Sequence, residues 1–252
     1  MGLPETSWHI YMLVMLAGVY AGIQNTLAGG GSFITFPALM MAGLSPLSAN
    51  MTSTVALFPG QITSALAGRS LAGGAAGLSV RQLTLISLAG GVAGAILLLS
   101  TPEQVFARLV PWLVLFATTV FAWGTFRKQS IHAAAHVSTP VIAVVQFCIA
   151  VYGGYFGGGI GILMLAALTI AGMQVRQAAA TKNILAMVMN ASAVLIFARS
   201  PLVDWLLVLA LGTGGVMGGL AGGWLMHRVP EKALRIFVIG VGMTLTTWLF
   251  LK

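Results

Sequence analysis

Long apolar runs alternate with short breaks along the whole 252-residue chain. Gly43 to Pro46, Ser100 to Pro102 and Arg199 to Pro201 are typical breaks, because glycine, serine and proline favour turns at helix ends. Most runs are long enough to cross a bilayer, which takes about 20 apolar residues. The pattern predicts helical segments at 8–28, 32–43, 46–68, 82–100, 104–126, 138–157, 160–172, 175–198, 202–226 and 233–251.

The second and seventh segments are too short to cross a membrane. Each has about a dozen residues, which at about 1.5 Å per residue does not span roughly 30 Å of hydrocarbon. Each also follows a glycine-rich break, Ala28-Gly29-Gly30-Gly31-Ser32 in the first half and Gly157-Gly158-Gly159-Ile160-Gly161 in the second. We expect two half-helices or re-entrant arms in matching places.

The two halves align without a gap across these breaks at an offset of 129 residues. Matching positions include Gly30 with Gly159 and Thr52 with Thr181. Related halves with interrupted helices are typical of secondary transporters. The expected fold is an all-α integral membrane protein of two inverted repeats, each of about five helical segments, with glycine-broken short or re-entrant helices meeting at a central site. We divide the chain into a first repeat (1–128), a central cytoplasmic connection (129–137) and a second repeat (138–252).

Composition supports a lipid environment. Hydrophobic residues make up 58% of the chain and charged residues only 6%, so a soluble fold would lack polar surface. The net charge of +8 comes from basic residues scattered singly, which argues against a nucleic-acid partner. Cys148 is the only cysteine, so an intrachain disulfide is excluded, and its apolar neighbours predict an inert, packed thiol. The segment before the first apolar run has no basic residue, so we expect it to be retained and not cleaved as a signal peptide.

Loop charges suggest an orientation. If the first two segments form a re-entrant hairpin, basic residues are more numerous on one side, which the positive-inside rule makes cytoplasmic. Both termini then lie outside and the halves are inverted. The alternative is that segment 8–28 crosses fully, which changes the topology. The richer side holds Arg69, Arg81, Arg127, Lys128, Arg176, Arg228, Lys232 and Arg235, and the other holds Arg108, Arg199 and Lys252.

The glycine breaks are the first candidates for a substrate site. Glycine lets the backbone approach a ligand, and the free N–H groups at the start of the following half-helix attract an anion. Asn25 precedes the first break and Ser32 follows it. The alternative is that these glycines only let helices pack closely, as small residues often do in membranes.

Lys182 is the second candidate, because it is a charged residue inside an apolar segment. Its ammonium would attract an oxyanion, and its neighbours Thr181 and Asn183 would add hydrogen bonds. The alternatives are snorkelling towards Arg176, or a structural pair with Asp204 or a carbonyl. The matching stretch of the first half, Asn50-Met51-Thr52-Ser53-Thr54, would form the other wall.

Other polar residues have structural interpretations. Gln24, Gln61 and Asn190 lie in apolar runs, where we expect interhelical hydrogen bonds. His132 and His136 have the spacing of a metal pair, but they lie in the polar connection and are expected to be solvated. No nucleotide-binding or hydrolase motif is present, so we expect neither an enzyme nor a cofactor or metal.

The paired motifs AGGGSFITFPALMMAGLSPLSANMTST and GGGIGILMLAALTIAGMQVRQAAATKN resemble those of the sulfite exporter TauE/SafE family, also called the toluene sulfonate uptake permease family. The resemblance implies a multi-pass transporter of the cell inner membrane that moves sulfite, sulfoacetate or a related organosulfonate. For the mechanism we predict alternating access, with the anion held between the two glycine breaks. Lys182 replaces the small or hydroxyl residue expected at its position, which leaves the substrate open. The family motifs fall on Gly29, Gly30, Gly31, Thr52 and Ser53, and on Gly157, Gly158, Gly159, Thr181 and Lys182.

Transport direction follows from the membrane potential. An inside-negative potential opposes anion uptake by about 2.3 kcal/mol per charge per 100 mV, so uptake would need coupling to H⁺ or Na⁺. Glu5, Glu103, Asp204 and Glu231 all lie near segment ends, where none is an obvious proton carrier. We therefore expect export or facilitated flux. The alternatives are an anion channel and a non-transporting membrane anchor subunit; the sequence does not indicate an oligomeric state.

Overall fold

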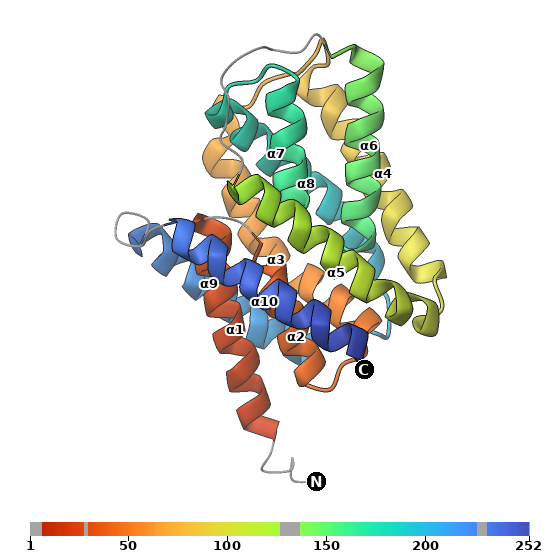
Figure 1. The fold of residues 1–252 in the computed structure, drawn as a ribbon, viewed down its shortest axis with the longest axis vertical. Coiled ribbons are helices and arrows are strands. Elements are labelled where there is room, and N and C mark those ends of the chain that lie inside the picture. Colours follow the sequence, from red (N-terminus) through yellow and green to blue (C-terminus); the bar gives the residue numbers. More distant parts are fainter. Residues whose placement is uncertain (1–6, 28–29, 127–136, 226–230, 252) are drawn as a thin grey trace.

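The computed structural model describes residues 7–27, 30–126, 137–225 and 231–251, and these residues form helices without any strand (Figure 1). The elements are α1 (Ser7–Leu27), α2 (Ser32–Met41), α3 (Pro46–Gly68), the 3₁₀ turn η1 (Arg69–Leu71), α4 (Val80–Ser100), α5 (Glu103–Phe126), α6 (Thr139–Tyr155), α7 (Ile160–Ile170), α8 (Val175–Phe197), α9 (Trp205–Leu225) and α10 (Glu231–Leu251). Short turns join α2 to α3, α4 to α5, α7 to α8 and α8 to α9, as the pattern of breaks predicts, whereas the α3–α4 connection is longer and contains a 3₁₀ turn.

Every predicted segment has a matching helix, and the differences at the ends have local causes. α2 and α7 have 10 and 11 residues, so the two short arms are confirmed. α2 stops two residues before Gly43, whose φ of +95° cannot continue a right-handed helix. α9 starts at Trp205 and not at 202, because the Asp204 carboxylate accepts a hydrogen bond from Leu207 N and caps the helix there.

Several helices have the length and composition of membrane spans. Within the described ranges these are Val80–Ser100, Glu103–Phe126, Val175–Phe197 and Trp205–Gly222. Large apolar side chains such as Trp112, Phe126 and Leu220 are exposed, as expected of a surface in contact with lipid. The chain is therefore an all-α, multi-pass membrane protein.

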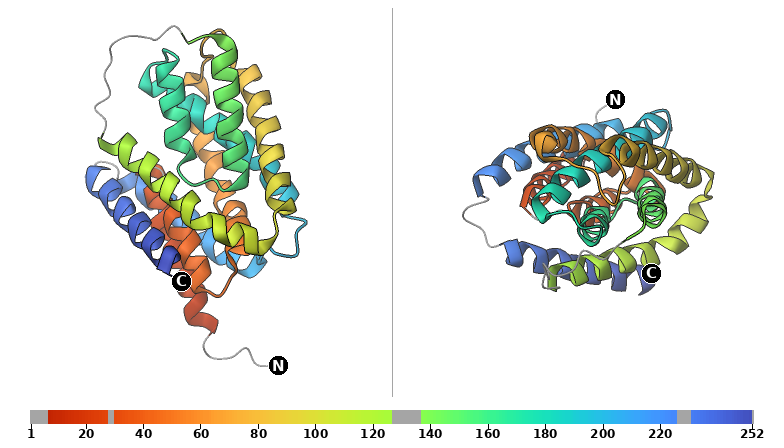
Figure 2. Two further views of the ribbon diagram at one scale, coloured as in Figure 1. Left: turned by 45° about the vertical axis from the view of Figure 1, so that its right-hand side comes forward. Right: turned by 90° about the horizontal axis from the view of Figure 1, so that it is seen from above.

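The helices pack in matching pairs. α1 lies on α9 and α4 on α6, while α3 packs along α8, and α5 and α10 lie side by side along one face of the molecule (Figure 2). If helix α1 corresponds to α6, α2 to α7, and so on, with α9 corresponding to α4, several contacts in one half have counterparts in the other. The pairs α1–α2 and α6–α7, α2–α3 and α7–α8, and α3–α9 and α8–α4 are all in contact. This agreement favours duplicated halves. Their inversion relative to the membrane stays a prediction.

Glycines allow the closest of these contacts. A side-chain carbon on Gly22 of α1 would overlap the main chain of Gly215 on α9, and one on Gly94 of α4 would overlap that of Val151 on α6. For these glycines, outside the two breaks, close packing is the correct interpretation.

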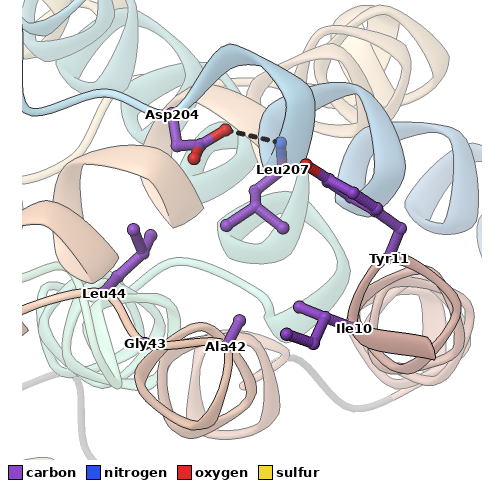
Figure 3. A pocket seen from close by; sticks show the side chains of 7 residues that line it. All are labelled: Ile10, Tyr11, Ala42, Gly43, Leu44, Asp204 and Leu207. Atoms are coloured by element: carbon purple, nitrogen blue, oxygen red, sulfur yellow. Dashed lines mark hydrogen bonds between the residues drawn. The ribbon is translucent and has the colours of Figure 1, made fainter. Parts of the chain in front are cut away.

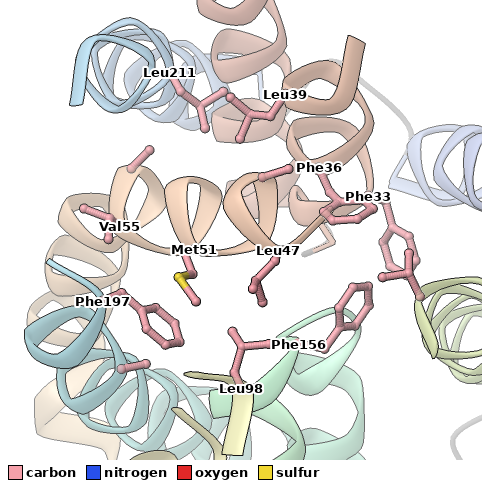
Figure 4. Close-up of a cluster of buried hydrophobic side chains, with 14 of the residues drawn as sticks. Phe33, Phe36, Leu39, Leu47, Met51, Val55, Leu98, Phe156, Phe197 and Leu211 are labelled. Carbon is pink, nitrogen blue, oxygen red and sulfur yellow. The ribbon is translucent and has the colours of Figure 1, made fainter. Parts of the chain in front are cut away.

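The main hydrophobic core surrounds the N-terminal half of α3. Residues 47–53 of this helix are all buried. Met51 points towards Phe197 of α8, while Leu211 of α9 lies beside Leu39 on the opposite side of α3 (Figure 4). A second cluster joins α4, α6, α7 and α8 around Leu83, Leu168 and Met189. Cys148 belongs to neither cluster. It is exposed on α6 beside exposed Phe147, so the prediction of a packed thiol is wrong.

Hydrogen bonds place several loop charges at one end of the molecule. The α3–α4 connection, between Arg69 and Arg81, is bound to Thr181 near the start of α8 and to Thr139 at the start of α6. The membrane orientation itself stays a prediction. Gly29, Arg127, Lys128, His132, His136, Arg228, Lys252 and all but residue 137 of the predicted connection lie outside the described residues, as do the side chains of Lys232 and Arg235.

Candidate functional site

The first glycine break separates α1 from α2. Gly30 has a φ of +89°, in the left-handed region that favours glycine. A side-chain carbon at Gly30 would also lie 2.7 Å from the ring of Phe121 on α5. Gly31 N donates a 2.8 Å hydrogen bond to Asn25 Oδ1, so Asn25 satisfies one N–H group at the start of α2.

The second break separates α6 from α7. Gly157 and Gly159 have φ values of +79° and +75°, and the N-terminus of α7 has no side-chain cap. Gly158 and Gly159 pack on Ala117 of α5, where an added side-chain carbon would lie 3.3 to 3.5 Å from its atoms. This break therefore leaves the N–H groups of a half-helix without the side-chain partner that Asn25 supplies to α2.

Both breaks contact α5, on neighbouring turns, because Ala117 and Phe121 are four residues apart. Aromatic rings fill the space beside them. The rings of Phe33 and Phe121 are 5.7 Å apart, and those of Phe36 and Phe156 are 5.8 Å apart, each pair in an edge-to-face arrangement. The fold thus brings the two breaks together.

Lys182 lies beside the first turn of α7. Its side chain is half-buried, and a side-chain carbon at Gly161, the second residue of α7, would lie 3.7 Å from Lys182 Nζ. An ammonium and a helix N-terminus both carry positive charge, so an anion between them is attracted by both. Asn183, also half-buried, is the next residue of α8.

The corresponding place in the first half is uncharged. Ser53, which aligns with Lys182, is buried, and its hydroxyl is 2.6 Å from the hydroxyl of Thr35 in α2. Ser32, which aligns with Gly161, is half-buried at the start of α2. The two halves therefore contribute different chemistry: a hydroxyl pair from one and an ammonium from the other.

Thr52 and Thr181, which align with each other, both hold main-chain groups. Thr52 Oγ1 accepts a 3.2 Å hydrogen bond from Asp204 N, before α9. Thr181 Oγ1 accepts from Gly73 N at 2.9 Å and is 3.1 Å from Gly73 O, before α4. Both threonines are fully buried and anchor the connection that precedes a long helix. Their contact with a substrate stays a prediction.

Two amide contacts join the halves. Asn190 Nδ2 donates a 2.7 Å hydrogen bond to Gln61 Oε1, which confirms the expected interhelical bond. Asn50 Nδ2 donates a 3.0 Å bond to Tyr155 O, directly before the second break. From the sequence we placed Asn50 in a wall of the site. The cost of an unpaired amide in an apolar run indicates that Asn50 needs a partner, but not that the partner is Tyr155.

A pocket of about 170 Å³ lies elsewhere, at the start of α9 (Figure 3). The Asp204 carboxylate at its edge is 3.0 Å from Leu207 N, which it caps. None of the predicted site residues lines this pocket. Within the part of the chain that the structure describes, no group of His, Cys, Asp and Glu side chains is arranged to hold a metal ion. The pocket is lined by Ile10, Tyr11, Ala42, Gly43, Leu44, Asp204 and Leu207.

Two half-helices whose glycine breaks both contact α5, within a bundle of membrane-length helices, are typical of secondary transporters, and comparison with known proteins agrees. The profile of the family described as "Sulfite exporter TauE/SafE" matches residues 14–249. The chain belongs to this family. The match covers both glycine breaks, Lys182 and every helix in full or in large part.

Named relatives of this TauE/SafE chain are bacterial. It is 28% identical to "Probable membrane transporter protein ORF9" of Sinorhizobium sp, over 96% of this chain and 93% of that protein. It is 24% identical to "Probable membrane transporter protein YfcA" of Escherichia coli (strain K12), over 93% and 87%. A "Probable membrane transporter protein" of Haemophilus influenzae is 25% identical, over 93% and 92%. No solved structure matches the chain.

These comparisons and the apolar helices identify the TauE/SafE chain as a multi-pass membrane transporter. The inner membrane fits its bacterial relatives. The names of the relatives describe transporters and not enzymes.

Proposed function

We propose that this transporter carries a small sulfur-containing anion, such as sulfite, sulfoacetate or a related organosulfonate, across the cytoplasmic membrane. The family description supports the substrate class. The observation that carries the proposal is the position of Lys182 Nζ beside Gly161, at the uncapped N-terminus of α7. Residues Gly157, Gly158, Gly159, Thr181, Lys182 and Asn183 would form one wall of the site, and Asn25, Gly29, Gly30, Gly31, Ser32, Thr52 and Ser53 the other.

The chemistry of these groups favours an oxyanion. An ammonium has three donors and no acceptor, and a sulfite or sulfonate group has three oxygens that accept. In a site shielded from water, the attraction between opposite charges is much stronger than in bulk solvent. The N–H groups of the first turn of α7 would complete the shell around the anion.

We further propose an alternating-access carrier built from two inverted repeats, working in the direction of export. The matching helix contacts of the two halves support a mechanism in which one bundle moves against the other. Export of an anion runs down the membrane potential and needs no coupling ion. Asp204 already caps α9 and Glu103 is exposed, so neither is placed as a proton carrier near Lys182.

The test is thermal unfolding of the purified protein in detergent with sulfite, sulfate, thiosulfate, sulfoacetate, taurine or a carboxylate. A bound anion at 100 times its Kd stabilises the folded state by about 2.7 kcal/mol. We expect sulfite or a sulfonate to raise the unfolding temperature, Lys182→Ala to abolish that rise, and the matched loss of an exposed cation, Arg176→Ala, to preserve it. If no sulfur anion stabilises the protein, or if Lys182→Ala responds like the parent, the proposed function is wrong.

A further inference from the structure

The two central helices, α3 and α8, differ in how deeply their aligned segments are buried. Met189 and Ser192 of α8 are 0% and 5% exposed. The residues that align with them in α3, Gly60 and Thr63, are both exposed. A side-chain carbon at Gly60 would meet no atom within 4 Å. The halves are therefore alike in sequence and helix order, but not in how closely these segments are covered.

The cover on α8 comes from α4 and α6. A side-chain carbon at Gly91 of α4 would lie 2.5 Å from Ser192 Oγ, and one at Gly153 of α6 would overlap the sulfur of Met189. In the first half, the helix that corresponds to α6 is α1. Within the described residues α6 packs on α8, but α1 makes no comparable contact with α3. Around Met189 and Ser192, α8 is covered by neighbouring helices, whereas around Gly60 and Thr63 the surface of α3 is exposed.

The open face of α3 carries two hydroxyl side chains. It consists of the exposed Pro59, Gly60, Thr63 and Ser64 with half-buried Gln61 beside them, and we call it the α3 face; exposed Leu66 and Ala67 adjoin it near the end of the helix. The hydroxyls of Thr63 and Ser64 both donate to Gly60 O, at 2.9 and 2.8 Å. Proline has no N–H, so it leaves a carbonyl of the preceding turn without its helical partner. Polar groups and unsatisfied carbonyls are costly against lipid, but not along a water-filled route.

The hydrogen bond between Gln61 and Asn190 joins equivalent positions of the two halves. The two residues are 129 positions apart, which is the offset that relates the two halves. In the alternating-access carrier proposed above, exchange of conformations between the halves would map a contact between equivalent residues onto itself. That contact would persist in both states, while other contacts between α3 or α8 and their neighbours would change places.

We propose that the α3 face lines the aqueous route by which the anion reaches the site, and that α1 closes over it in the opposite state by bringing Gln24 against Gly60. Gln24 aligns with Gly153, and Gly60 with Met189. The contact present here pairs Gly153 with Met189, and the proposed contact pairs Gly60 with Gln24. In each state, therefore, one glycine makes room for one long side chain. As α1 closes on α3, α6 moves away from α8, and the Gln61–Asn190 hydrogen bond is kept during this change. The inference rests on the alternating-access carrier proposed above.

Accessibility of single cysteines tests the route. In a Cys148→Ser background, Thr63→Cys is compared with its aligned counterpart Ser192→Cys in substrate-free proteoliposomes, using a membrane-impermeant maleimide. We expect Thr63→Cys to react at least ~tenfold faster, because Ser192 becomes accessible only when the second half opens. Equal rates, or reaction of Thr63→Cys only with a lipid-soluble maleimide, overturn the proposal, since the latter places the α3 face against lipid.

Closure by α1 has its own test. Gly60→Leu fills the space that Gln24 is expected to enter, and the space is open in this structure, so the protein should fold with normal anion-dependent stabilisation. We expect loss of sulfite flux together with unchanged fast labelling of Thr63→Cys, whereas the matched Met189→Leu keeps its flux. Wild-type flux in Gly60→Leu contradicts closure at this point.

The labelling experiment needs no substrate, so its outcome is separable from the proposed function. If no sulfur anion stabilises the protein but Thr63→Cys reacts faster than Ser192→Cys, the substrate assignment fails and the route stands. If sulfite stabilises the protein and the two cysteines react equally, the route fails and the substrate assignment stands.

Discussion

The side-chain amide of Asn50 donates a 3.0 Å hydrogen bond to the main-chain oxygen of Tyr155. Asn50 is a buried residue of α3 in the first half, and Tyr155 is the last residue of α6 in the second. The last carbonyls of a helix have no partner within the helix. Asn50 donates to such a carbonyl directly before the second glycine break. It therefore connects α3 of the first half to the break between α6 and α7 in the second half.

Loss of the Asn50–Tyr155 hydrogen bond should lower the free energy of unfolding, because the second glycine break loses a contact with α3. Asn50→Leu removes the donor and leaves the Tyr155 carbonyl unsatisfied, at a cost of about 1–3 kcal/mol. Asn50→Asp keeps the size but turns a carboxylate towards a carbonyl, and should cost more. Chemical unfolding in detergent measures both.

The matched control for Asn50 is Thr54→Val, one turn further along α3. The Thr54 hydroxyl bonds only the carbonyl of Asn50 in its own helix, so its loss should cost well under 1 kcal/mol. Equal effects of Asn50→Leu and Thr54→Val would show that the bond to Tyr155 contributes nothing specific.

A fixed carboxylate beside Lys182 should compete with the anion. Gly161→Asp places its side chain where the first carbon is 3.7 Å from Lys182 Nζ, so the carboxylate would pair with the ammonium. We expect stabilisation by sulfite or sulfonate to fall by more than about tenfold in apparent affinity, while the protein still folds. Gly161→Ala adds only a methyl group at van der Waals distance and should bind nearly normally. Normal binding by Gly161→Asp would remove Lys182 from the site.

Alanine at the breaks should be costly because of backbone conformation. Gly30 and Gly159 have positive φ, a region that costs a residue with a side chain roughly 1–2 kcal/mol. At Gly30 the new methyl group would also press on Phe121. Gly60→Ala is the control, since Gly60 is helical, has open space and should become slightly more stable. Unfolding temperatures of the three variants give the comparison, and a neutral Gly159→Ala would contradict the structure.

The helices were predictable because their signals are local. An apolar run such as 175–198 identifies α8 without knowledge of its neighbours, and the break at 157–159 follows from glycine alone. Ends were less certain where a side chain sets them, as Asp204 does for α9. Thr52 and Thr181 look like ligand donors in the sequence but hold main-chain groups in the fold. Contacts between residues more than a hundred positions apart leave no such local signal.

Lys182 shows the same limit within the site. Its charge inside an apolar segment singled it out, but only the fold places its ammonium beside Gly161 at the start of α7. Cys148 shows the converse. Its apolar neighbours predicted packing, whereas α6 turns this face outward, where an apolar sequence is equally suited to lipid.

The coupling energy of the Gln61–Asn190 hydrogen bond can be separated from the other effects of each substitution. Gln61→Leu and Asn190→Leu each leave one amide without its partner between α3 and α8, whereas the double variant leaves none. A double-mutant cycle in detergent should give a favourable coupling of roughly 0.6–1.7 kcal/mol, the range for such bonds in membranes. Since the bond joins equivalent positions of the two halves, it stabilises both states alike, so its loss should lower the unfolding temperature without changing the ratio of Thr63→Cys to Ser192→Cys labelling. A changed ratio would mean that the bond belongs to one state only.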